Sequence, residues 1–197
     1  MKKVLSVFLC ALIICAGFAG CSGPNNEMTE ENITQTVNEA VTALQEFDTE
    51  KLGKYIDSQT LSIIMGYADK HEQFAELGRA IFKNLQVEIK EIDIENATVT
   101  ISVRNKNLSE TAGDFAKKLK DTYSTIKLLK LLNDESFLDQ KLSELCSQIE
   151  EDTMKKVPTD IELKITQGKK NLVLTFDENA ENAVSGGALT AIKKIYS

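Results

Sequence analysis

Several residue types are scarce in this chain of 197 residues, and each scarcity excludes a class of protein. Two prolines and ten glycines are too few for a collagen-like or a proline-rich disordered chain. Tryptophan is absent, which removes the usual stacking platform for a sugar ligand. The formal net charge is −7, and because phosphate binding needs a basic surface, we expect no nucleic-acid partner.

Composition also limits the chemistry of catalysis and metal binding. His71 is the only histidine, and its charged neighbours predict a solvated surface position rather than a zinc ligand or a member of a catalytic triad. Acidic residues are numerous, but they stand in charged runs that are typical of solvent-facing surfaces. The sequence therefore predicts no catalytic residue and no metal site.

The first twenty residues have the layout of a secretory signal peptide. Met1-Lys2-Lys3 is a short basic segment, and residues 4–20 carry no charge. Such a segment reaches about 26 Å as a helix, just short of the ~30 Å hydrocarbon core of a bilayer. No basic stop-transfer cluster follows it. We therefore predict a signal peptide over residues 1–20 rather than a transmembrane helix.

The segment Phe18-Ala19-Gly20-Cys21 resembles the lipobox of bacterial lipoproteins, in which small residues precede a cysteine. The resemblance implies cleavage between Gly20 and Cys21 and a covalent diacylglyceryl group on Cys21, which is the only cofactor we expect. Phe18 departs from the pattern, which usually has leucine or another aliphatic residue. Two acyl chains anchor a protein stably, whereas one binds reversibly. These residues predict a lipoprotein on the extracytoplasmic face of the cell membrane, and the excess of lysine over arginine suggests an AT-rich, Gram-positive source.

The remaining residues predict a tether and one domain. Residues 21–31 are expected to be the lipidated cysteine and its tether, and residues 32–197 a single α+β domain. Two of the four cysteines lie inside the signal peptide, so Cys146 is the one thiol expected to stay free in the mature protein. Its helical apolar surroundings predict a buried hydrophobic side chain rather than a nucleophile.

The domain begins with helical spacing of its apolar residues. The first predicted helix has Thr29 as its N-cap, and its apolar stripe is Ile33, Val37, Ala40, Val41, Leu44 and Phe47. Asp48 is the predicted cap of a second helix, and helical patterns continue over 61–68 and 72–85. Over 86–105 and 161–176, apolar residues instead stand at every second position. This alternation predicts two β-hairpins with turns at 95–97 and 168–170. We therefore expect N-terminal helices packed on an antiparallel sheet of these two hairpins.

Between the hairpins, residues 109–156 predict an inserted helical hairpin. Ser109 is the predicted cap of its first helix, which runs to about 132, and Asp134 the predicted cap of the second, which runs to about 154. The expected core stripe of the first helix is Phe115, Leu119, Ile126 and Leu129. Three further leucines widen it, and they form either more core or an exposed strip for a partner or lipid: Leu128, Leu131 and Leu132. The chain ends in a predicted helix over 180–195, which Gly186-Gly187 could break.

The order of these elements, together with Phe47-Asp48-Thr49-Glu50-Lys51-Leu52-Gly53-Lys54-Tyr55, resembles exported lipoproteins of the nuclear-transport-factor-like (cystatin-like) α+β superfamily. The resemblance implies a cone-shaped domain with an interior cavity. That superfamily includes both enzymes and binding modules, so the resemblance does not decide the chemistry. The Asp and His pair that its enzymes often place in the cone has no counterpart here.

The leading hypothesis is a lipid-anchored, non-enzymatic binding module. The membrane would be one partner, and an unknown protein or a small apolar ligand the other, bound in the cone interior or at the helical pair. One alternative is an enzyme with Tyr55, Tyr67, Tyr123 or an isolated buried acid as general acid or base. A second alternative is the substrate-capture component of a transporter, although the mature chain is short for two lobes around a cleft.

Overall fold

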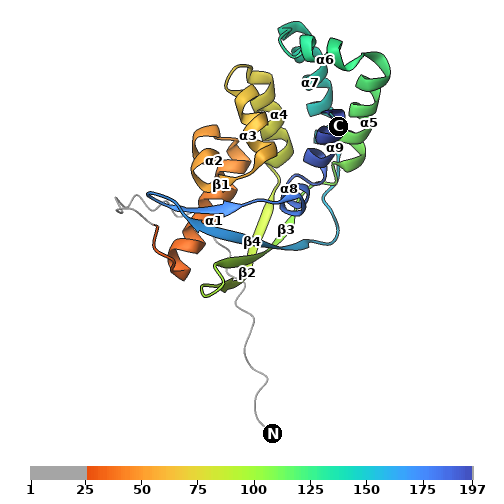
Figure 1. Ribbon diagram of the computed structural model, residues 1–197. Helices are drawn as coiled ribbons and strands as arrows, with labels where there is room; N and C mark the ends of the chain where they lie inside the picture. Colours follow the sequence, from red (N-terminus) through yellow and green to blue (C-terminus); the bar gives the residue numbers. More distant parts are fainter. Residues whose placement is uncertain (1–25, 197) are drawn as a thin grey trace.

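The computed structural model describes residues 26–196, so the predicted signal peptide, Gly20 and Cys21 lie outside the described residues. The described chain has the predicted α+β architecture, in which helices pack on one face of an open sheet (Figure 1). Four helices precede the first hairpin, and one very short strand lies between the second and the third of them. The helices are α1 (Glu30–Glu46), α2 (Thr49–Tyr55), α3 (Gln59–Ala68) and α4 (Glu72–Phe82).

The sheet contains both predicted hairpins and one strand that was not predicted. The strands are β1 (Ile56–Asp57), β2 (Gln86–Asp93), β3 (Thr98–Arg104), β4 (Thr159–Gln167) and β5 (Leu172–Thr175), in the spatial order β1-β5-β4-β3-β2. The hairpins are antiparallel, as expected. They join through β3 and β4, and β1 pairs with β5 in parallel. The sheet is therefore mixed, because two residues after α2 are too few to produce an alternating pattern in the sequence.

Three of the predicted N-caps, Thr29, Asp48 and Asp134, are confirmed. The predicted cap Ser109 is wrong, because Ser109 is already the first residue of its helix and Leu108, which has no capping side chain, stands at the N-cap. Thr29 accepts a hydrogen bond from the Asn32 amide at 3.2 Å, and Asp48 accepts one from the Lys51 amide at 3.0 Å. The prediction of a tether up to residue 31 is wrong at its end, since α1 begins at Glu30. The chain is held to the domain already at Asn26, whose side chain donates to the Gly168 carbonyl at 3.2 Å.

The inserted region consists of three helices rather than the predicted pair. These are α5 (Ser109–Thr122), α6 (Thr125–Leu131) and α7 (Glu135–Glu151), and the predicted cap Asp134 accepts a hydrogen bond from the Phe137 amide. The helix expected up to residue 132 ends early because Tyr123 has an extended backbone, and Ser124 then caps a new helix. The break changes the direction in which the side chains of α6 point.

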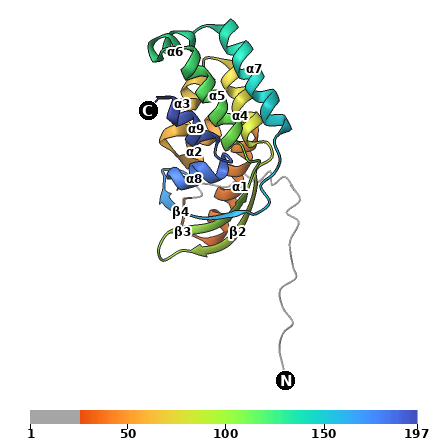
Figure 2. The ribbon, with the colours of Figure 1, turned by 90° about the vertical axis from the view of Figure 1, so that its right-hand side faces the viewer.

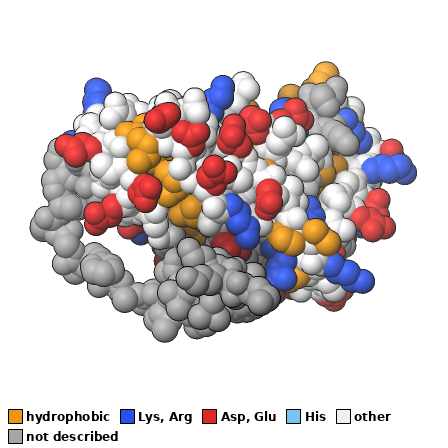
Figure 3. Space-filling model, turned by 90° about the horizontal axis from the view of Figure 1, so that it is seen from below, with side chains coloured by type: hydrophobic (Ala, Val, Ile, Leu, Met, Phe, Trp, Pro, Cys, Tyr) orange, Lys and Arg blue, Asp and Glu red, His pale blue; other side chains and the backbone are white. Residues whose placement is uncertain are grey.

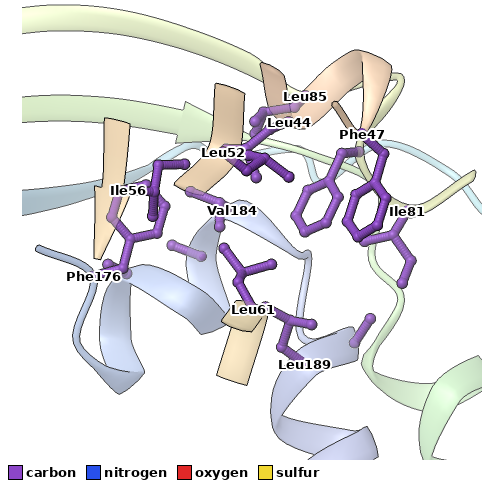
Figure 4. Close-up of a cluster of buried hydrophobic side chains, with 14 of the residues drawn as sticks. Leu44, Phe47, Leu52, Ile56, Leu61, Ile81, Leu85, Phe176, Val184 and Leu189 are labelled. Carbon is purple, nitrogen blue, oxygen red and sulfur yellow. The ribbon is translucent and has the colours of Figure 1, made fainter. Parts of the chain in front are cut away.

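Apolar side chains fill the space between the sheet and the helices. Figure 4 shows side chains from helices and from β1 converging in this core, among them Leu44, Leu52, Leu61 and Val184. The core-facing residues of the two central strands are almost fully covered: Val99, Ile101, Val103, Leu163 and Ile165. The predicted cavity of a cone would lie against this face of the sheet, which is instead packed with aliphatic side chains.

The segment that follows β3 holds the ends of three helices. The Asn105 side chain donates to the carbonyls of Ile81 at 3.0 Å and Val184 at 2.7 Å, near the ends of α4 and α8 (Glu178–Val184). The Lys106 ammonium donates to the carbonyls of Ile149 at 2.9 Å and Glu150 at 2.7 Å in the last turn of α7. Carbonyls at a helix C-terminus lack helical partners, so these bonds satisfy groups that burial would otherwise leave unpaired.

Gly186 and Gly187 break the C-terminal helix, which is the second of the two readings of the sequence. They separate α8 from α9 (Ala188–Tyr196) and have φ angles of +62° and +100°. A Cβ atom on Gly186 would lie 1.9 Å from the Lys106 carbonyl oxygen. The Gly186 carbonyl in turn accepts a hydrogen bond from the Leu108 amide at 2.9 Å. Gly186 therefore allows α8 to end against the Lys106 segment.

We predict that Gly186→Ala lowers the free energy of unfolding by about 3 kcal/mol, since the new methyl group meets a backbone carbonyl and the residue must keep a positive φ. Gly53→Ala is the matched control, because Gly53 lies on the exposed side of α2 with no atom near its hypothetical Cβ. The control should stabilise the protein by about 0.5–1 kcal/mol. Urea unfolding measures both values, and equal effects of the two variants would contradict the proposed close approach.

Candidate functional site

An apolar pocket lies among the helices, away from the sheet. Its cavity volume is about 100 Å³, and α3 and α4 line one side while α5, α6 and α7 line the other. Lys141 is the one charged side chain in the lining. The full lining is Phe47, Ile63, Ile64, Tyr67, Phe74, Leu77, Gly78, Ile81, Phe82, Phe115, Leu119, Leu128, Leu132, Phe137, Leu138, Lys141, Leu142, Leu145 and Leu189.

Phe47 forms one wall of the pocket, and its unusual backbone puts it there. It ends α1 in the left-handed region with a φ of 51°, and its ring is parallel to the ring of Phe82 at 6.1 Å. A Cβ atom at Gly78 would lie 2.3 Å from the Phe47 ring. Because Gly78 has no side chain, the Phe47 ring can pack directly against α4. Any larger residue at this position would displace the ring.

Aromatic pairs and polar contacts fix the helices around the pocket. Tyr67 on α3 stacks on Phe74 of α4 at 5.2 Å, while Tyr123 meets the edge of Phe137 on α7 at 5.6 Å. Helices α4 and α7 are also joined by polar pairs at both ends of their contact: Gln73 with Asp139, and Lys83 with Glu150. The two helices that form the deep walls are thus fixed to each other.

One charged network borders the pocket. The Lys141 ammonium lies 3.2 Å from the Glu144 carboxylate, which also accepts a hydrogen bond from Lys118 of α5 at 2.9 Å. The bonds and charges of these two lysines, Lys118 first, hold the pKa of Glu144 below its ordinary value. The network has two cations and one anion, so it presents a net positive charge beside an apolar cavity.

The three leucines predicted as an interaction surface have different positions. Leu128 and Leu132 line the pocket, while Leu131 is half-buried and not part of the lining. The exposed residues are instead Ile126 and Leu129, at 72% and 49% exposure. Their predicted place in a core stripe is wrong, because the break at Tyr123 turns α6 relative to α5. That this region binds a partner stays a prediction.

The residues considered for catalysis do not converge. Tyr67 lines the pocket, but Tyr55 and Tyr123 do not. Burial, followed by the charge of Glu39, raises the pKa of Tyr55, which makes its hydroxyl a weaker proton donor. His71 is half-buried at the N-cap of α4 with its ring 6.4 Å from Phe74, so the predicted fully solvated position is only partly right.

An isolated buried acid exists, at Glu181 of α8. Its carboxylate accepts hydrogen bonds from the hydroxyls of Ser58 and Thr60, both at 2.6 Å, and from the Thr60 amide at 3.2 Å. These donors lie at the first turn of α3, where the helix dipole favours a negative charge. Glu181 is absent from the pocket lining and joins α8 to α3. Its contacts are those of a structural residue.

Cys146 lies on α7 and packs partly against the core. Desolvation by burial, with smaller contributions from Glu76 and Glu150, raises the pKa of its thiol to about 11. A thiol with such a pKa is protonated at neutral pH, which agrees with the prediction of a hydrophobic rather than a nucleophilic role.

Neither a metal centre nor a membrane-spanning helix is found in the described part of the chain. Between residues 26 and 196, no three His, Cys, Asp or Glu side chains are placed to hold a metal ion. Over the same range, no helix is long and apolar enough to cross a bilayer. Figure 3 shows Asp and Glu side chains spread over the face seen from below, with Lys and Arg side chains among them.

Comparison with known proteins gives little further information. No protein-family model matches the chain, and no curated protein matches it. Among solved structures, the chain is similar to a "putative lipoprotein (ycdA)" from Bacillus subtilis, with 16% sequence identity and a TM-score of 0.31. The match covers 81% of this chain and 47% of the other, so the chain spans about half the length of that protein. At this TM-score the likeness supports no conclusion about fold or function.

Most of the pocket could not be located from the sequence. Its lining comes from six helices and the end of α1, and each contributing residue has the spacing of an ordinary core residue. Whether such residues meet or leave a gap depends on the angles between helices, which periodicity does not contain. The one usable signal was the excess of leucines at 128–132, which exceeds what one buried stripe needs.

We predict slow alkylation of Cys146 by a maleimide. A pKa of about 11 instead of 9.0 leaves about a hundredfold less thiolate at pH 8, so the rate should be about a hundredfold below that of an unstructured cysteine peptide. The rate should rise about tenfold per pH unit up to pH 10. Mass spectrometry of the peptide that contains Cys146 measures it, and a rate within threefold of the control peptide would contradict the raised pKa.

Proposed function

We propose that this protein is a lipid-anchored extracytoplasmic lipoprotein that binds a small apolar ligand in the pocket between its helices. The observation that carries the binding proposal is the pocket itself, a cavity of about 100 Å³ lined almost entirely by aliphatic and aromatic side chains. Apolar cavities are favourable binding sites because water inside them finds few hydrogen-bond partners.

The size of the cavity sets the size of the group that it accepts. An apolar cavity of about 150 Å³ is large enough for benzene, so about 100 Å³ corresponds to a short alkyl group or part of a ring. Tyr67 and Lys141 are the two lining residues whose side chains carry a polar group. Such a site favours binding by shape and burial over acid–base chemistry, because no carboxylate belongs to the lining.

The proposed anchor is consistent with the way the chain enters the domain. Residues 22–25 separate Cys21 from Asn26, and this connection reaches at most about 18 Å. Asn26 is fixed to the turn between β4 and β5 by hydrogen bonds with Gln167 and Gly168. An anchor at Cys21 would therefore keep this side of the domain close to the membrane.

The relationship to the nuclear-transport-factor-like superfamily is a further part of the proposal. The described elements follow the expected order of helices, hairpin, inserted helices, hairpin and terminal helices. A ligand site among the helices would be a departure from a cone interior, since the corresponding face of the sheet is packed.

To test the pocket, we predict that Phe137→Trp reports binding of 1-hexanol. The chain has no tryptophan, so the new indole beside the cavity is a unique fluorophore. Its emission should change saturably with a dissociation constant in the millimolar range, as expected for burial of a few methylene groups. Leu119→Phe, added to this variant, should narrow the pocket and weaken binding at least fivefold.

The matched control for this titration is Tyr55→Trp. Tyr55 is likewise a half-buried aromatic residue, but it lies on α2 outside the pocket lining. Its emission should not respond to hexanol. A response of the same size in both variants, or a linear response without saturation in Phe137→Trp, would show that the pocket is not the binding site.

The anchor is tested by expressing the Cys21→Ala variant in a bacterial host that processes lipoproteins. The variant should appear in the medium or remain as an uncut precursor, while Cys146→Ala, which changes a thiol outside the lipobox, should stay in the membrane fraction. Intact mass measurement of the membrane-bound protein should show cleavage before Cys21 and added diacylglyceryl mass. Normal membrane retention of a trimmed Cys21→Ala protein would refute the anchor.

A further inference from the structure

Helix α6 covers the pocket with one face and presents the other to solvent. Leu128 on this helix and Leu132 at its C-cap line the pocket. On the outer side, Ile126 and Leu129 are among the most exposed large apolar side chains in the described chain. Figures 1 and 2 place α6 at the end of the molecule remote from the sheet, where it joins α5 to α7.

The ends of α6 are suited to movement. Tyr123 has an extended backbone before the helix, and Asn133 with Asp134 forms a turn after it. The capping hydrogen bonds of α6 are local: Ser124 accepts from the Lys127 amide, and the Leu132 amide donates to Leu128. Leu128 is the buried residue of the helix. Short helices with a single buried side chain belong to the parts of a protein that open at low cost.

The same region is strongly basic although the protein is acidic. Residues 117–132 contain five lysines and one aspartate, which gives this segment a net charge of +4 in a chain of net charge −7. Lys127 and Lys130 lie on α6 itself, and the Lys127 ammonium is 5.2 Å from the centre of the Tyr123 ring. Beside the pocket, Lys118 and Lys141 outnumber the Glu144 carboxylate that they share. Lysines of α5, α6 and α7 thus lie on one side of the apolar cavity.

We propose that α6 is a lid, and that the ligand is a single-chain amphiphile with an anionic head, such as a medium- or long-chain alkyl carboxylate. The inference rests on the proposed function of the pocket and names its ligand class. The cavity of about 100 Å³ holds only a few carbon atoms of a chain, so a longer tail enters when α6 moves outward. The tail replaces Leu128 and Leu132 as the contact of the inner walls, and the carboxylate remains among the lysines of the lid.

The free amphiphile, rather than a bilayer surface, is the source that the arrangement favours. The N-terminal end of the described chain is held at the β4–β5 turn by Asn26, whereas α6 lies at the end of the molecule remote from the sheet (Figure 1). A chain tethered through this N-terminal end would direct the lid away from its own membrane.

The test is a titration of the Phe137→Trp protein with hexanoate, octanoate, decanoate and dodecanoate below their micelle concentrations. Affinity should rise about two- to fourfold for each added methylene up to dodecanoate, since each buried methylene adds favourable transfer free energy. Alkyltrimethylammonium ions of the same chain lengths should bind at least tenfold more weakly. An affinity that stops rising after hexanoate, or equal binding of the cationic series, would overturn the proposal.

Charge variants separate the lid from the rest of the surface. The double variant Lys127→Gln/Lys130→Gln should reduce the preference for carboxylate to within about twofold of the uncharged alcohol. Lys169→Gln/Lys170→Gln is the matched control, because these two lysines are exposed in the turn between β4 and β5 and not on α6. This control variant should leave the preference for carboxylate over alcohol unchanged. An unchanged preference in the first variant would remove the assigned role of α6.

Hydrogen exchange tests the movement directly. Amides of α6 should exchange at least tenfold faster than those of α7 in the free protein, and dodecanoate should slow them whereas hexanol should not. Equal protection of α6 and α7 in the free protein would refute the lid. If hexanol binds but dodecanoate binds no more tightly, the pocket function stands and the lid inference fails; if neither binds, both fail. Tight binding to anionic phospholipid vesicles without uptake of monomeric dodecanoate would assign the surface to a bilayer instead and refute the proposal.

Discussion

The position of the helical part of this molecule depends on two polar side chains that follow β3. Asn105 bonds to carbonyls near the ends of α4 and α8, and Lys106 bonds to carbonyls in the last turn of α7. Each of these carbonyls is near the core, where an unpaired acceptor is costly. Satisfying all of them from one segment requires three helices to end at the same place. The close approach of Gly186 to the Lys106 carbonyl follows from the same requirement.

That constraint also accounts for the pocket. Helices α4 and α7 both end at this segment. They are joined by Lys83 with Glu150 near that end and by Gln73 with Asp139 near their beginnings. Helix α5 begins just after the same segment, but it runs to the other side of the cavity and returns through α6. At the other end α6 connects α5 to α7, and a space remains between these helices and α4. The space is apolar because each helix directs its hydrophobic stripe toward it.

Local features of the fold were predictable from the sequence, whereas features set by helix angles were not. The hairpins follow from alternation at 86–105 and 161–176, and the caps Thr29, Asp48 and Asp134 follow from side chains that can accept a backbone hydrogen bond. The break at Tyr123 was missed because no glycine or proline marks it. Its consequence was large, since Ile126 and Leu129 moved from the expected core to the surface and Leu128 and Leu132 became lining.

The exposure of Ile126 and Leu129 is the point at which local rules and the fold disagree. A seven-residue helix of threonine, isoleucine, leucine and lysine could have turned Ile126 inward if burial alone decided its orientation. The turn after Leu132 and the extended Tyr123 prevent this, so two large apolar side chains remain in water beside Lys127 and Lys130. Natural sequences mostly avoid such conflicts, and where they keep one, a function often accounts for it. A lid that opens needs an outer face that stays in water and an inner face with few buried contacts. Helix α6 meets both requirements, because its outer face carries lysines and Leu128 is its one buried side chain.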